Sequence, residues 1–144
     1  KYPKSNFNKD WRIMLEKVRY TKTGKKFNIF EFEGRLHERI ILTKEQYLEH
    51  ITRKHPEISI EIIEEVLVTP DIVTKKSKSK KEHFYQKKID NIYFFVVVSL
   101  YKNVKNVRFI LTAYSVESNK YLKEKNIHYV YKRKSDYMEV LKWK

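Results

Sequence analysis

Two of the chain's five histidines lie close together in HITRKHPE, residues 50–57. A histidine has an ordinary pKa of about 6.5, so His50 and His55 are candidates for taking and giving protons near neutral pH. Five helical residues turn through about 500°, which leaves the two rings about 140° apart and prevents a straight helix from aiming both at one metal ion. The pattern predicts one proton-transfer histidine with a structural neighbour, or a metal-free pair if the chain bends at Pro56.

Each histidine also has a structural interpretation. A histidine before a proline often closes a helix end, so His55 has a structural role as an alternative to a catalytic one. His50 is therefore the leading candidate for proton transfer. Arg53 and Lys54 lie between them and are candidate substrate-binding cations. A metal-dependent nuclease usually needs several carboxylates around its ion, and too few flank this pair. We therefore expect no metal and no cofactor.

Polar side chains also recur at every second position of two predicted strands, and such residues share one face of a sheet. The strand at 107–114 is predicted to point one set into the core: Val107, Phe109, Leu111 and Ala113. Its other face is predicted to carry Arg108, Ile110, Thr112 and Tyr114. The strand at 83–89 offers a matching row of His83, Tyr85 and Lys87. Cations, phenols and a hydroxyl on neighbouring strands could hold a phosphate and its transition-state charge, and a plain solvated face is the alternative.

The net charge is +14, from 32 Lys and Arg against 18 Asp and Glu. Such a field attracts polyanions, of which nucleic acid is the commonest, whereas a basic surface that serves only solubility is the alternative. The turn at 75–81 concentrates this charge, and Lys75, Lys76 and Lys78 are predicted to bind substrate. The absence of cysteine excludes thiol catalysis and disulfides. No apolar run reaches the roughly 18 residues of a membrane span, so we expect a cytoplasmic protein, or a toxin domain delivered into a target cytoplasm.

The periodicity predicts one α+β domain over 1–144, with helices first and a sheet after. A hairpin over 11–33 turns near Gly24, with a short helix over 9–18 as its competitor. Thr43 and Gln46 form a capping box, so a helix begins at Lys44, buries a stripe of Tyr47, Leu48 and Ile51, and ends near His55. The remaining predicted elements are a second helix from Pro56, strands at 39–43, 71–74, 83–89, 92–101 and 107–114, and a helix over 116–125.

These segments, in this order, resemble the phage-associated branch of the barnase/EndoU/colicin/RelE-like nucleases. The likeness covers about 27–115 and rests on the pattern H-I-x-x-x-H-P-E, the Pro-Asp after the second helix, and the final strand VRFILTAY. The resemblance implies two short helices packed on a curved antiparallel sheet, with the active site on the open sheet face. By position it carries over six candidate catalytic residues: His50, His55, Tyr85, Lys87, Thr112 and Tyr114. The basic extension 116–144 has no counterpart.

Together these features predict a metal-independent endoribonuclease, and a toxin is one candidate for its biological role. RNA supplies its own nucleophile, because the 2′-hydroxyl attacks the phosphate and leaves a 2′,3′-cyclic phosphate end. Single-stranded or tRNA-like RNA is the expected partner, and an acidic antitoxin or immunity protein is a candidate second partner for the basic face. The alternative is a non-catalytic RNA- or DNA-binding module of the same fold.

Overall fold

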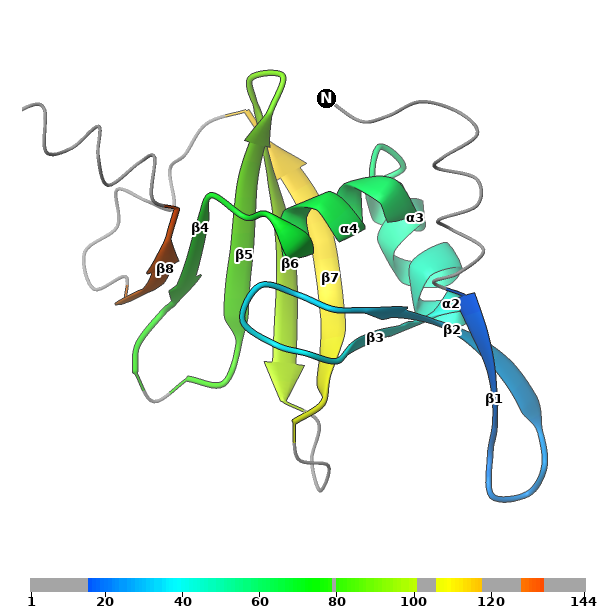
Figure 1. Cartoon of the computed structure of the whole chain (residues 1–144). Helices are drawn as coiled ribbons and strands as arrows, with labels where there is room; N and C mark the ends of the chain where they lie inside the picture. Colours follow the sequence, from blue (N-terminus) through cyan, green and yellow to red (C-terminus); the bar gives the residue numbers. More distant parts are fainter. Residues whose placement is uncertain (1–15, 79, 101–105, 118–127, 134–144) are drawn as a thin grey trace, which may run out of the picture.

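The computed structural model describes residues 16–78, 80–100, 106–117 and 128–133, and shows an α+β fold built on one eight-stranded sheet (Figure 1). The strand order is β1-β2-β3-β7-β6-β5-β4-β8, with β3 parallel to β7 and all other neighbours antiparallel. The strands are β1 (Glu16–Tyr20), β2 (Lys26–Phe32), β3 (Ile40–Thr43), β4 (Ile72–Lys75), β5 (His83–Ile89), β6 (Ile92–Leu100), β7 (Arg108–Val116) and β8 (His128–Lys132). The predicted fold class is confirmed.

The first helical segment begins as predicted, but its middle does not follow the expected periodicity. It runs through α2 (Lys44–Gln46), the π-helical turn η1 (Tyr47–Ile51) and α3 (Thr52–Lys54). Thr43 caps it by accepting a hydrogen bond from the Gln46 amide. A π turn changes the angle between successive residues, so Ile51 is buried while Leu48 is 53% exposed. Leu48 was therefore wrongly placed in the buried stripe.

The second helix, α4 (Ile60–Val68), begins four residues later than the predicted start at Pro56. Ser59 is the N-cap, and its side chain accepts a hydrogen bond from the Ile62 amide. Ile58 is buried outside the helix, and its carbonyl accepts a hydrogen bond from the Tyr47 hydroxyl. The cap and this tertiary contact together place the helix start.

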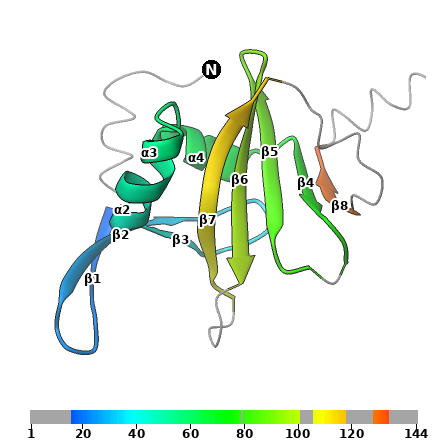
Figure 2. The same cartoon turned by 180° about the vertical axis from the view of Figure 1, so that it is seen from behind.

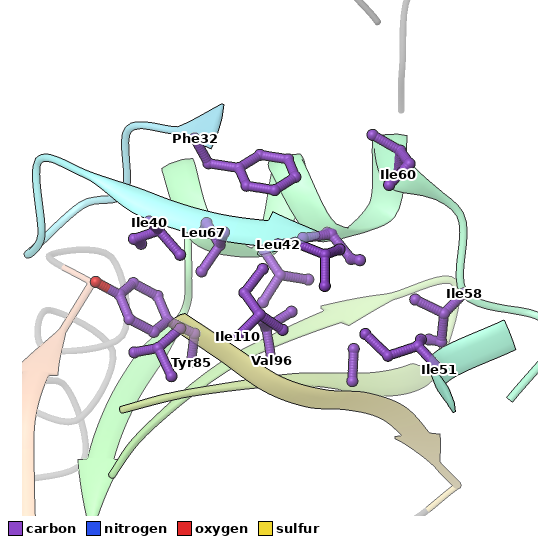
Figure 3. Close-up of a cluster of buried hydrophobic side chains, with 14 of the residues drawn as sticks. Phe32, Ile40, Leu42, Ile51, Ile58, Ile60, Leu67, Tyr85, Val96 and Ile110 are labelled. Atoms are coloured by element: carbon purple, nitrogen blue, oxygen red, sulfur yellow. The ribbon is translucent and has the colours of Figure 1, made fainter. Parts of the chain in front are cut away.

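The sheet curves so strongly that β2 and β3 lie across the β5–β7 region, on the side that also carries α4 (Figures 1 and 2). The main core fills the space between these layers. Figure 3 shows side chains from both layers meeting there, among them Leu42, Leu67, Val96 and Ile110, all buried. The Tyr85 ring belongs to the same core and is fully buried, while its hydroxyl points away from the aliphatic side chains.

A β-bulge breaks the alternation predicted for β7. The register between β6 and β7 shifts between Val97 and Val98, opposite residues 110–112. As a result Ile110 lies in the main core and Leu111 is 42% exposed, the reverse of the prediction. The predicted polar row is therefore split between the two faces of the sheet.

On β7, Arg108 lies on the core side with Ile110, whereas Thr112 and Tyr114 lie on the opposite side. Tyr114 stacks there on Phe95, its partner in register on β6, with ring centroids 5.2 Å apart. Thr112 and Tyr114 therefore do not share a face of the sheet with Arg108.

The ends of the chain were predicted less well. The hairpin β1–β2 with Gly24 in its turn is confirmed, whereas the competing helix over 9–18 is wrong from Glu16 onward and otherwise lies outside the described residues. The helix predicted over 116–125 lies mostly outside them, and β7 extends to Val116. The strand β8, which pairs with β4, was not predicted. Within the described ranges, none of the helices is long and apolar enough to cross a membrane.

Candidate active site

The loop between β2 and β3 places a histidine against the start of β5. His37 Nδ1 lies 2.6 Å from the Tyr85 hydroxyl, and the Leu36 amide donates a hydrogen bond of 3.2 Å to the same oxygen. The His37 and His83 rings meet edge to face with centroids 4.6 Å apart. The contact follows from the fold, because curvature of the sheet brings residues 33–39 over β5. We refer to His37, His83, Tyr85 and Arg108 as the histidine cluster.

Gly34 lets this loop approach the sheet closely. Its amide donates to the His37 carbonyl at 2.8 Å, which closes the turn. A Cβ at this position would lie 2.6 Å from Ile40 Cδ1 and 3.3 Å from the Tyr85 hydroxyl. Absence of a side chain at Gly34 therefore leaves the space in which the hydroxyl and the loop meet.

The environment keeps both histidines of the cluster neutral near neutral pH. Burial lowers the pKa of His37 to about 3, with the charges of Arg108 and His83 acting in the same direction. Burial, Arg108 and Lys75 lower the pKa of His83 to about 4, against a hydrogen bond to the Lys81 backbone. A neutral imidazole has one ring nitrogen that can accept a hydrogen bond or a proton. The lowered pKa makes each ring a weak base in the free protein, and a bound phosphate would raise that pKa toward the working pH.

Tyr85 is suited to orient the His37 ring. Burial raises the pKa of Tyr85 to about 12, so the phenol keeps its proton. A hydroxyl can donate to Nδ1 or accept from it, so it can hold the ring in either tautomer. Because Nδ1 is occupied by this contact, Nε2 is the His37 nitrogen left for a substrate.

A pocket of about 390 Å³ adjoins the cluster and is lined by Leu36, His37, Glu38, Leu100, Asn106 and Arg108. Arg108 brings a guanidinium with five N–H donors in a fork that matches phosphate oxygens. Its charge acts on His37, His83 and Tyr85 alike. The pocket therefore places a neutral imidazole beside a guanidinium of the kind that can bind phosphate.

The structure brings together three residues that the sequence singled out, His83, Tyr85 and Arg108. Of the predicted lysine turn, Lys75 is near enough for its charge to lower the pKa of His83, and its Nζ donates to the Lys78 carbonyl at 3.0 Å. Lys76 lies over the Phe84 ring. His37 was missed, because an isolated histidine in a loop has no periodicity to mark it.

Two other predicted residues meet at the far end of β7. The His55 and Tyr114 rings have centroids 6.0 Å apart, and His55 Nδ1 lies 3.9 Å from Glu57 Oε2. Ser115 donates a hydrogen bond of 2.7 Å to the same carboxylate oxygen. These contacts tie the segment after α3 to β7 and bring a histidine, a carboxylate and a hydroxyl together there.

The remaining predicted site residues belong to neither group. His50 is half-buried in η1, Thr112 is half-buried on β7, and Arg53 and Lys54 are exposed in α3. Lys87 lies on β5, and its side chain reaches the end of α4, where Nζ contacts Glu65 Oε2 at 3.0 Å and Thr69 Oγ1 at 2.6 Å. Across the described parts of the chain, no three His, Asp or Glu side chains are grouped so that they could hold a metal ion.

Comparison with known proteins agrees with the fold. The model of the family described as phage-Barnase-EndoU-ColicinE5/D-RelE like nuclease3 matches residues 17–124. This range contains every residue of the histidine cluster and of the pocket. No curated protein and no solved structure matches significantly. The chain therefore belongs to the phage-associated branch of the barnase/EndoU/colicin/RelE-like nucleases.

Proposed function

We propose that the chain is a metal-independent endoribonuclease whose reaction centre is the pocket beside the histidine cluster. The observation that carries the proposal is the placement of His37, oriented by a buried phenol, beside Arg108 in a pocket. Membership of a nuclease family supplies the reaction class. Choice of RNA follows from the chemistry, because a base and a cation suffice when the substrate carries its own nucleophile.

In the proposed reaction neutral His37 carries its proton on Nδ1, which donates a hydrogen bond to the Tyr85 oxygen, so that Nε2 is free to take the proton of the 2′-hydroxyl. The 2′-oxygen forms a bond to phosphorus as the bond to the 5′-oxygen breaks, and the proton is returned to the departing 5′-oxygen. The products are a 2′,3′-cyclic phosphate and a 5′-hydroxyl, with no net proton uptake. Arg108 holds the phosphate and stabilises the charge that builds on its oxygens. Tyr85 acts through His37 as a positioning residue.

The alternative placement of the reaction centre, at His50 and His55 on the helix, makes a different prediction. We would incubate the purified chain with RNA in excess EDTA, beside His37→Ala and His50→Ala, and determine the fragment ends. We expect cyclic phosphate ends from the native chain and from His50→Ala. In His37→Ala the rate of cleavage should fall by about 10²–10⁴-fold. Loss of cleavage in His50→Ala alone would show that the reaction centre lies on the helix.

The net charge of +14 favours a second candidate, a non-catalytic nucleic-acid-binding module of the same fold. It predicts that RNA stays intact in the EDTA experiment, with binding unaffected by His37→Ala. A toxin role, and an acidic antitoxin or immunity protein as partner, rest on the phage-associated family and on charge complementarity. Growth arrest on expression of the native chain, relieved by His37→Ala, would support the toxin role.

A further inference from the structure

Three cations surround a single carboxylate on the outer side of the β1–β2–β3 part of the sheet. Glu31 Oε1 contacts Arg19 Nη2 at 3.3 Å and Lys17 Nζ at 3.5 Å, and Glu31 Oε2 contacts Arg39 Nε at 3.1 Å. The side chains of the cations are 39–45% exposed. We refer to these four residues as the Glu31 cluster.

The Glu31 cluster lies on the side of the sheet that faces away from the main core, beside a smaller buried cluster of Ile29, Ile41 and Val107. Antiparallel partners share a face, and Glu31 alternates with the core residues Phe30 and Phe32 along β2. In the same register Arg19 lies opposite Phe27, whose side chain is 36% exposed. A cation and an accessible aromatic ring therefore stand side by side on this surface.

The cluster is joined directly to the proposed reaction centre. Arg39 follows Glu38, which lines the pocket, and the Arg39 carbonyl accepts a hydrogen bond of 2.9 Å from the Arg108 amide. The two arginines thus sit on neighbouring backbone positions where β3 and β7 begin, with their side chains on opposite sides of the sheet. A chain held at Arg108 could pass around these strand ends onto the outer surface.

The charge balance leaves the cluster with an excess of cation. Three positive groups against one carboxylate give a net +2. Exposed ion pairs each contribute only about 0–1 kcal/mol, so stability does not require three partners for one acid. Arg39 uses Nε for Glu31, and its terminal nitrogens have no hydrogen-bond partner among the described residues. The cluster therefore holds N–H groups in place that can donate hydrogen bonds to a phosphate group.

We infer that the Glu31 cluster is a second binding site for the substrate, which holds the phosphates of single-stranded RNA beyond the scissile bond. Arg19, Arg39 and Lys17 contact the phosphates, and Phe27 stacks with a base, a contact of about 1–3 kcal/mol in single-strand binders. The inference rests on the proposed function for its choice of RNA. It adds a requirement for substrate length that the pocket alone does not impose.

The test separates binding from cleavage by using the His37→Ala background. We would measure affinity for a labelled single-stranded RNA oligonucleotide by fluorescence anisotropy over a salt series, with and without Arg19→Gln and Arg39→Gln together. Two lost phosphate contacts should make the salt slope shallower by about 1.4 and weaken binding roughly tenfold near 0.15 M salt. The matched control removes two exposed cations elsewhere, Lys88→Gln with Lys132→Gln, and should leave the slope unchanged.

Cleavage with His37 intact gives the second readout. The Arg19→Gln, Arg39→Gln variant should cleave a dinucleotide as the native chain does, and should show a raised KM with unchanged kcat for the longer RNA. Equal salt slopes for the two double variants would overturn the inference, as would an equal loss on the dinucleotide. Loss of binding to anionic lipid vesicles without loss of binding to RNA would also overturn it.

Failure of the proposed function would look different. If the native chain cleaves no RNA, the reaction is wrong, whereas a changed salt slope in the uncleaved complex would still establish the Glu31 cluster as a nucleic-acid site. If the native chain cleaves RNA and the slopes are equal, the reaction stands and only the second site is wrong.

Discussion

Replacement of Tyr85 by phenylalanine tests the link between fold and chemistry most directly. The ring is fully buried in the main core, and phenylalanine keeps it (Figure 3). Only the hydroxyl is lost, with its contacts to His37 Nδ1 at 2.6 Å and to the Leu36 amide at 3.2 Å. No cavity of ring size is created, so the effect reports the hydroxyl alone.

The expected loss of stability is small. A buried polar group left without a partner costs about 1–3 kcal/mol. Leu36 is at the surface, so water can replace the hydroxyl at its amide, whereas His37 is half-buried. We therefore expect the free energy of unfolding to fall by about 1–2 kcal/mol, measured by urea denaturation.

The expected loss of activity is larger and lies in kcat. Without the hydroxyl the His37 ring is free to turn, and misplacement of a catalytic group by about 1 Å can cost about 10²-fold. Arg108 still holds the phosphate, so KM should change little. A ring that moves toward water also regains part of its ordinary pKa, which lies above its present value of about 3. Because the base must be neutral, the acidic limb of the pH profile should move to higher pH.

Tyr47→Phe is the matched control, because it removes a hydroxyl that donates to the Ile58 carbonyl at 2.9 Å, away from the pocket. It should lower stability by a similar amount and leave kcat and the acidic limb unchanged. If Tyr85→Phe behaves in the same way, with lowered stability but native kcat and pH profile, the phenol is purely structural and the argument for His37 loses its support.

Three further predictions follow from buried groups. Gly34→Ala should lower the free energy of unfolding by about 1–3 kcal/mol in urea, because the new Cβ forces the buried Ile40 side chain to shift from 2.6 Å away. Burial raises the pKa of Glu64 to about 7, so ionisation of this carboxyl lowers the free energy of unfolding as pH rises above about 4.5. Glu64→Gln should therefore raise the free energy of unfolding by roughly 1–2 kcal/mol near pH 8 and leave it unchanged below about pH 4.5. Since burial lowers the pKa of His37 and of His83, the unfolded chain binds their protons first as pH falls from about 6.5 to about 4, and the native chain should lose stability there. The steepness of this loss is set by the number of extra protons that the unfolded chain binds, and solvent screening narrows the pH range over which it occurs. His37→Gln should flatten the loss in urea titrations at several pH values.

Elements governed by local sequence were predicted well. The capping side chain of Thr43 and the turn at Gly24 depend on neighbouring residues, and both are found where expected. The strand predicted at 83–89 has these bounds in the structure, because the lysine/serine turn precedes it and the turn residues Asp90 and Asn91 follow it. The order of such segments also pointed to the nuclease family that the chain belongs to.

Elements that depend on contacts between distant segments were predicted poorly. The bulge opposite residues 110–112 and the π turn at Tyr47–Ile51 shift side chains by one position, and neither changes the composition from which periodicity is read. Both errors moved predicted residues to the wrong side of an element. The domain boundaries and the helix histidines as catalysts stay predictions.

The sequence by itself determined the charge, most of the strands and many of the groups that could do chemistry, because these depend on residue types and short-range patterns. Only the tertiary structure decided which groups meet. His37 lies 48 positions before Tyr85, and no local rule connects them. Curvature of the sheet closes that distance to 2.6 Å, and the same packing removes water from both histidines and so lowers their pKa.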